Sequence, residues 1–188
     1  MKKKILLSIA LLLLFSAGAA FADPKSGFSV NAGLASHSMS IANAAPAFSY
    51  DSSGLSLGID YQIALSKSFS LNPFLMTSGE TVSGYCSGGL CASPSTEVTS
   101  GHGIIGLQLR YWINDIFVGG HITSYSEVLD NGTSNVNASG PGAGLAVGWE
   151  KHDGGLYVMG QLDGATLKYS DADVDLSGVR LSVGYRWK

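Results

Sequence analysis

The feature that most constrains the fold is an alternation of apolar and polar residues, which returns in eight separate stretches of the sequence. Successive side chains of a β-strand point to opposite faces, so each stretch is predicted to be a strand with one apolar face. No amphipathic helical pattern follows residue 22, and the chain is therefore predicted to be all-β. The apolar rows lie within residues 28–34, 55–65, 69–75, 105–113, 116–122, 143–149, 156–162 and 181–187.

Residues 1–22 have the layout of a secretory signal peptide. Residues 2–4 are lysines, residues 5–15 form an apolar core, and Ala20 and Ala22 fit the small-x-small rule for cleavage before Asp23. The apolar core is much shorter than the roughly 20 residues of a transmembrane helix, which favours cleavage over a retained anchor. Residues 23–188 are then predicted to form a single domain.

The charge of the exported part excludes one class of partner. Without the three lysines of the signal region, eight basic residues remain against fourteen acidic ones. Nucleic acid is therefore not an expected partner, because phosphate binding needs clustered positive charge. No later segment offers 18 consecutive apolar residues, so a membrane location would require strands.

The connections between the predicted strands alternate in length. The stretches around 43–53, 84–99, 129–140 and 170–175 are long and polar, whereas those at 66–68, 114–115 and 151–154 are short. An even number of strands with long loops at one end and tight turns at the other is typical of outer-membrane barrels. The prediction is an eight-stranded antiparallel up-and-down transmembrane β-barrel with both termini at the turn end.

The charged residues within the strands fall on the face opposite the apolar rows. In a barrel that face is the lumen, where charges are tolerable when they are paired, so we expect a paired network. Glycines on the same face would make room for long side chains. The network residues are Asp60, Arg110, Glu150, Asp163, Arg180 and Arg186, and the glycines are Gly58, Gly106, Gly144, Gly148 and Gly184.

Several individual residues carry further expectations. Tyr185 and Trp187 would belong to an aromatic girdle at the membrane boundary. Pro73 cannot donate a hydrogen bond to a neighbouring strand, which predicts a bulge or an early strand end there. By the same alternation Phe74, Met76 and Trp112 would point into the lumen.

The only two cysteines, Cys86 and Cys91, are separated by four residues that include two glycines. Export to an oxidising compartment favours a disulfide that closes a tight loop. A metal or redox pair is the alternative, but the spacing is not CxxC and no histidine stands beside it.

With these features the sequence resembles the small eight-stranded outer-membrane barrels, which include the OmpX-like proteins and the membrane domain of OmpA-like proteins. The resemblance implies location in the outer membrane of a Gram-negative bacterium, among outer-membrane lipid and lipopolysaccharide. It also implies insertion by the barrel assembly machinery, which reads alternating apolar residues and a final aromatic in the last strand. Leu181, Val183, Tyr185 and Trp187 match that pattern, although Lys188 follows the aromatic.

An eight-stranded barrel has room inside for little more than its own side chains, so a wide pore is not expected. The expected role is structural, or an interaction of the outer loops with an extracellular ligand or surface, without a cofactor. A small lipid- or ligand-binding barrel of the lipocalin type is an alternative, but it would need a polar exterior and an apolar cavity.

An enzymatic alternative depends on His121, Thr123, Ser124 and Glu127. They loosely resemble the His-x-Ser motif of lipid A deacylases, but Thr123 stands where the family has serine and the following asparagine is absent. His121 and Thr123 would face the lumen, which favours a polar interior pair. His102 is interpreted in the same way, while His37 and His152 are expected at strand or turn edges. Four scattered histidines do not predict a metal site.

Overall fold

The computed structural model describes residues 26–41, 48–94, 98–130, 135–151, 154–169 and 172–187. The predicted signal peptide at 1–22, His152 and Lys188 lie outside the described residues. Within the described residues, no helix has the length and apolar character needed to cross a bilayer.

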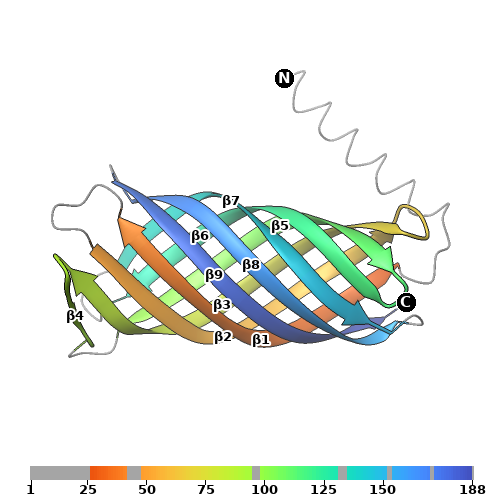
Figure 1. Cartoon of the computed structure of the whole chain (residues 1–188), viewed down its shortest axis with the longest axis horizontal. Helices are drawn as coiled ribbons and strands as arrows, with labels where there is room; N and C mark the ends of the chain where they lie inside the picture. Colours follow the sequence, from red (N-terminus) through yellow and green to blue (C-terminus); the bar gives the residue numbers. More distant parts are fainter. Residues whose placement is uncertain are drawn as a thin grey trace, which may run out of the picture.

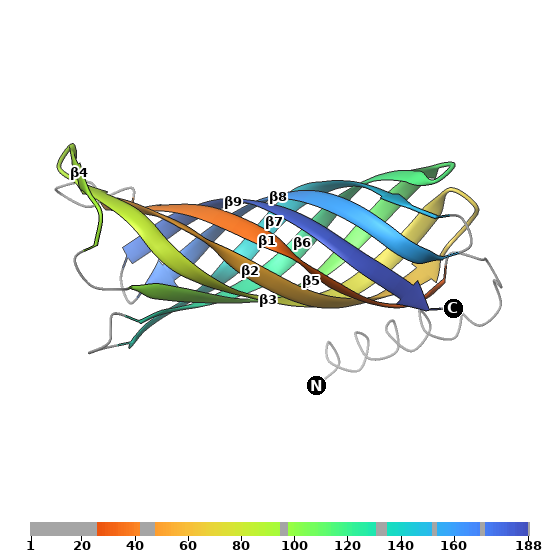
Figure 2. The same ribbon diagram turned by 90° about the horizontal axis from the view of Figure 1, so that it is seen from below.

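The strands form one closed antiparallel barrel (Figures 1 and 2). In the described part of the chain the wall consists of eight long strands: β1 (Gly27–Ile41), β2 (Phe48–Ala64), β3 (Phe69–Ser87), β5 (Thr99–Ile113), β6 (Ile116–Asp130), β7 (Asn135–Glu150), β8 (Gly155–Tyr169) and β9 (Ala172–Trp187). Strand β1 pairs with both β2 and β9, and β2 pairs with β3, which closes the wall. The predicted all-β, eight-stranded up-and-down barrel is confirmed.

A ninth, short strand lies outside the closed wall. Strand β4 (Leu90–Ala92) pairs only with β3 and extends the β3 hairpin beyond the barrel at one end, which we call the rim (Figure 1). The opposite end, which we call the turn end, carries the short connections at 65–68 and 114–115. Phe28 of β1 and Trp187 of β9 pair there, so the described chain begins and finishes at the turn end.

The outer surface has two zones of opposite character. The half of the wall nearer the turn end exposes an apolar band. Its members include Val30, Leu34, Leu55, Leu57, Ile105, Leu107, Leu109, Val118, Ile122, Leu145, Val147, Leu162, Leu181 and Val183. The half nearer the rim exposes a polar collar. Its members include Ser36, Ser38, Ser40, Asp51, Ser53, Thr77, Thr81, Ser124, Ser126, Ser139, Thr166, Asp175 and Ser177.

The lumen also differs between the two halves of the barrel. Behind the apolar band lie buried charged and amide side chains and a small apolar cluster of Trp112, Phe117, Ala146, Tyr157 and Met159, whereas a larger apolar cluster lies mainly behind the polar collar. The larger cluster consists of Met39, Tyr50, Phe74, Met76, Val82, Ile104, Tyr125, Ala138, Ala165, Leu167, Val174 and Leu176. One end of the barrel is thus built for an apolar surrounding, and the other is built like a water-soluble protein.

This difference between the two halves corrects the predicted loops. The stretches 43–53, 84–99, 129–140 and 170–175 were expected to be loops, yet β2, β3, β6, β7 and β9 run well into them. The strands continue with period two, but most outward residues there are polar and many of the inward residues are apolar. A prediction that follows only outward apolar rows ends each strand at the edge of the apolar band.

Two expectations for β3 have different outcomes. The bulge or early end at Pro73 is wrong, because β3 continues to Ser87 and its pairing with β2 keeps one register on both sides of the proline, from Asp60↔Phe74 to Ile63↔Leu71. The register shift lies nearer the rim, between Asp51 and Ser52. The lumenal position of Phe74 and Met76 is confirmed, since both are buried.

Candidate functional site in the lumen and at the rim

The lower lumen, behind the apolar band, is organised around Arg186 of β9. Its guanidinium donates to Asp60 of β2 at 3.0 Å and to Glu150 of β7 at 2.9 Å, and all three side chains are almost fully buried. Arg186 also donates to the backbone carbonyl of Gly27 at 2.9 Å. Ser29 and Asn72 donate to the Asp60 carboxylate. One cation therefore holds two acids from different sides of the wall.

Arg110 of β5 lies in the same lumen but is held differently. Among the described residues it has no carboxylate within ion-pair distance. Its guanidinium donates to Gln108 at 2.6 Å and to Gln62 at 3.2 Å. It also lies 4.4 Å from the ring centre of Phe117, in the geometry of a cation–π contact. Arg110 therefore lies in the lumen with the predicted network but is held by amide groups and an aromatic ring.

A second ion pair lies higher in the lumen. Arg180 of β9 contacts Asp163 of β8 at 2.6 Å, and His121 of β6 contacts the other oxygen of the same carboxylate at 2.7 Å. The remaining members of the predicted network are thus placed: Asp163 and Arg180 belong together, apart from the Asp60–Arg186–Glu150 group.

The four deacylase-like candidates do not converge on one site. His121 faces the lumen, but its acidic partner is Asp163 and not Glu127. Ser124 lies exposed on the outer surface, while Thr123 has its hydroxyl buried without a hydrogen-bond partner. Nucleophilic catalysis requires hydroxyl, imidazole and acid in one hydrogen-bonded group, and the described residues do not form it here.

Sequence reasoning missed a cluster behind the polar collar, formed by His37 of β1, Glu80 of β3 and His102 of β5; we call it the histidine cluster. His37 Nδ1 lies 2.7 Å from Glu80 Oε1, and His102 Nε2 lies 3.7 Å from Glu80 Oε2. The two imidazole rings face each other with centres 4.5 Å apart. All three side chains are fully buried, so the expectation that His37 lies at a strand edge is wrong, as is the view that these histidines are scattered.

Hydroxyl groups and a second acid surround the histidine cluster. Ser52 and Ser78 each donate to the Glu80 carboxylate at 2.7 Å. Burial by itself raises the pKa of Glu80, but the hydrogen bond and charge of His37 together with the Ser52 hydroxyl outweigh it and lower that pKa to about 2. Burial, and then the charge of His37, lower the pKa of His102.

Glu127 of β6 lies next to the histidine cluster. Its carboxylate is 4.0 Å from His102 Nε2 and accepts hydrogen bonds from Tyr50 at 2.5 Å, Ser100 at 2.9 Å and Tyr169 at 2.6 Å. Burial and the Glu127 charge raise the pKa of Tyr50, so its hydroxyl stays a donor.

Contacts between side chains from distant strands cross the lumen at several heights. Tyr50 of β2 donates to Glu127 of β6, and Arg180 of β9 donates to Tyr125 of β6 at 3.3 Å. Nearer the turn end, Tyr157 of β8 donates to Asp60 of β2 at 3.2 Å. Each pair joins strands three positions apart around the wall. The described side chains therefore span the lumen, as expected for a barrel this narrow.

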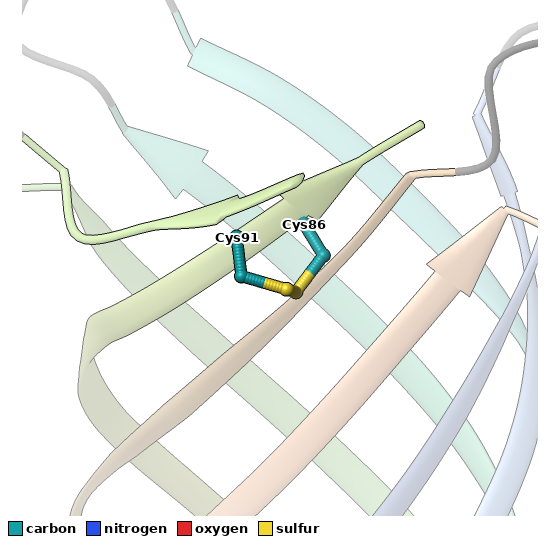
Figure 3. The surroundings of a disulfide bond; sticks show 2 residues. All are labelled: Cys86 and Cys91. Atoms are coloured by element: carbon teal, nitrogen blue, oxygen red, sulfur yellow. A yellow bond between two sulfur atoms is a disulfide. The ribbon is translucent and has the colours of Figure 1, made fainter. Parts of the chain in front are cut away.

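At the rim, the β3–β4 hairpin is closed by a disulfide between Cys86 and Cys91 (Figure 3). The two cysteines are direct partners across the hairpin, and the turn between them uses Gly88 and Gly89 with positive φ. Leu90 at the tip is 82% exposed. The disulfide therefore fixes a hairpin that projects beyond the wall.

The exposed charges of the collar are mostly acidic. Asp51, Asp130, Asp173 and Asp175 are exposed there, and within the described residues Lys168 is the collar's one exposed basic side chain. The collar consequently carries a negative potential.

The geometry is that of a narrow antiparallel barrel with an apolar outer band, side chains across the lumen and a polar rim, and this fold is the one found in small outer-membrane β-barrels. No protein-family model matches the sequence, and no curated protein matches it. Solved structures do match the fold. Ail, the attachment invasion locus protein of Yersinia pestis, in complex with the heparin analogue sucrose octasulfate, aligns with a TM-score of 0.56 at 11% identity over 86% of this chain and 99% of that chain. Neisserial surface protein A aligns with a TM-score of 0.57 at 13% identity over 86% of this chain and 98% of that chain.

Proposed function

We propose that this protein is an integral outer-membrane barrel that presents its collar and rim at the cell surface as an interaction platform. The observation that carries the proposal is the two-zone wall. Outer-membrane barrels carry an outward apolar band about 25 Å tall, and a polar outer collar favours contact with water over lipid. The strands therefore extend beyond the lipid and hold the rim hairpin away from it.

The filled lumen supports interaction over transport. Side chains from strands three positions apart meet inside the barrel both near the turn end and behind the collar. A solute would have to displace buried ion pairs such as Arg186 with Asp60 and Glu150. Removing one partner of such a pair costs several kcal/mol. The outer surface is then the part of the molecule available to a partner.

The acidic collar indicates which partners fit. Ail was solved with a polysulfated heparin analogue. The present collar, with Asp51, Asp173 and Asp175 against Lys168, would repel such a polyanion. We therefore propose a neutral or basic partner, and contact with lipopolysaccharide through its acyl chains on the band. The barrel assembly machinery is the proposed partner during insertion.

The proposal is tested by placing an epitope tag at each end of the barrel. A tag between Gly88 and Gly89 at the rim is expected to be stained by antibody on intact cells. The matched control is a tag between Asn114 and Asp115, in the tight turn between β5 and β6, which is expected to be stained only after permeabilisation. Equal staining of both tags on intact cells, or staining of only the control, would contradict the proposed orientation.

A further inference from the structure

We propose that His37, Glu80 and His102 form a binding site for one zinc ion inside the barrel, behind the polar collar. The site lies apart from the rim surface of the proposed function, and nothing in that function requires it. Two imidazoles and one carboxylate are a ligand set that zinc uses in proteins, with a fourth position left for water or another side chain.

The donor atoms already lie close to the positions that a metal needs. One atom from each of the three side chains lies within 4.8 Å of the others. His37 Nδ1 lies 2.7 Å from Glu80 Oε1, and His102 Nε2 lies 3.7 Å from the other carboxylate oxygen, Oε2. Donor atoms around tetrahedral zinc lie about 3.3–3.5 Å apart, so binding would change these separations by about 0.5–1.5 Å.

The charges behind the collar favour a divalent cation. Glu80 and Glu127 are both buried, and among the described residues their ion-pair partners are histidines only. In the lower lumen, by contrast, the buried carboxylates of Asp60 and Glu150 are both paired with the permanently charged Arg186. A zinc ion would neutralise both carboxylates while leaving both imidazoles neutral, which removes the cost of uncompensated buried charge.

The surrounding residues would hold such a site in place. Ser52 and Ser78 already orient the Glu80 carboxylate. Gly178 of β9 leaves the space that the His37 ring fills, because a β-carbon at Gly178 would collide with that ring. Glu127 at 4.0 Å from His102 is placed to act as the fourth ligand or to bind a zinc-bound water.

The site would link three strands of the wall that are not all neighbours. His37, Glu80 and His102 lie on β1, β3 and β5, and β2 separates the first two. The collar has no lipid around it in the proposed orientation, so a metal link across these strands would stabilise the part of the barrel that the membrane does not support.

The test is metal analysis of the folded protein as it exists in the outer membrane. Protein from zinc-supplemented cells is extracted from the outer membrane in mild detergent, passed over chelating resin and analysed by mass spectrometry for zinc per chain. A second portion is unfolded in urea with EDTA and refolded in detergent with either ZnCl2 or EDTA, and the melting temperatures are compared.

The variants are His37→Gln and His102→Gln, with His121→Gln as the matched control. His121 is also fully buried and also contacts a carboxylate at 2.7 Å, but it has Arg180 beside that carboxylate and no second histidine. We expect one zinc per chain and a zinc-dependent rise in melting temperature for the wild type and His121→Gln. Both should be lost in His37→Gln and His102→Gln.

The proposal is overturned if the wild type holds no zinc in either preparation, or if the His37 and His102 variants bind as much as the wild type. Should those variants fail to fold, the visible spectrum of wild-type protein refolded with Co²⁺ decides. An intense tetrahedral spectrum supports the site, and its absence refutes it.

Discussion

Replacing Arg186 by methionine is the sharpest test of how the lower lumen is stabilised. The change keeps most of the side-chain volume but removes the cation that contacts Asp60 at 3.0 Å and Glu150 at 2.9 Å. Both carboxylates are nearly fully buried, at 4% and 2% exposure, so solvent cannot replace the lost partner. Removing one partner of a buried ion pair costs about 3–5 kcal/mol, and we expect Arg186→Met to lower the free energy of unfolding by that amount.

The assay is urea unfolding in detergent micelles, followed by tryptophan fluorescence and by the change in gel mobility between folded and unfolded barrel. The control is the triple variant Arg186→Met, Asp60→Asn, Glu150→Gln, which removes the two uncompensated acids. Replacing a whole buried ion group by neutral side chains is often nearly neutral, so the triple variant should recover most of the lost stability. A single variant as stable as the wild type, or a triple variant no better than the single one, would refute the reasoning.

Three further predictions follow from the same geometry. Arg110→Ala should lower the free energy of unfolding by about 1–3 kcal/mol, which is less than for Arg186→Met in the same assay. The reason is that Arg110 donates hydrogen bonds to Gln108 and Gln62, so its removal leaves no carboxylate without an ion-pair partner. A larger loss of unfolding free energy than for Arg186→Met would contradict this reasoning. Leu145→Arg, on the apolar band of β7, should destabilise the folded barrel by about 2–4 kcal/mol and reduce the amount of folded protein in the outer-membrane fraction. The control Ser139→Arg, on the collar of the same strand, should assemble normally. Equal amounts of the two variants in that fraction would count against the placement of the band. Replacing Cys86 and Cys91 by serine should change the free energy of unfolding of the barrel by less than about 1 kcal/mol, because the β3–β4 hairpin lies outside the closed wall. The same change should speed protease cleavage of that hairpin. An unchanged cleavage rate would show that the disulfide does not fix the hairpin.

The wall of the barrel could be predicted from the sequence because outward apolar rows mark it directly. Leu55, Leu57 and Ile59 alternate with buried Ser56 and Asp60, and the same parity holds in the structure. The rim half could not be predicted in the same way, because the polarity of the two faces reverses there. Ser36 and Ser38 face outward while Met39 is buried, and these residues give no outward apolar row to follow.

The partners inside the lumen were harder to predict than the faces. Parity places Arg110 and Arg186 in the lumen, but only the register of the strands and the length of each side chain decide which acid each arginine reaches. Arg186 reaches two acids, whereas Arg110 reaches glutamines and Phe117. His37 and His102 lie 65 residues apart in sequence and meet because β1, β3 and β5 place them at one height. If the alternation of inward and outward residues is continued beyond the apolar rows, it places both histidines in the lumen. It does not show that the two side chains meet.

The measurement that tests the central claim most directly is the labelling of single cysteines on β1 of intact cells. In a Cys86→Ser, Cys91→Ser background, Val30→Cys lies on the apolar band and Ser38→Cys lies on the polar collar, and both positions face outward from the same strand. With a membrane-impermeant maleimide, the account predicts that Ser38→Cys is labelled and Val30→Cys is protected. Equal labelling of the two positions, or protection of Ser38→Cys alone, would contradict a barrel whose band lies in lipid and whose collar stands outside the cell.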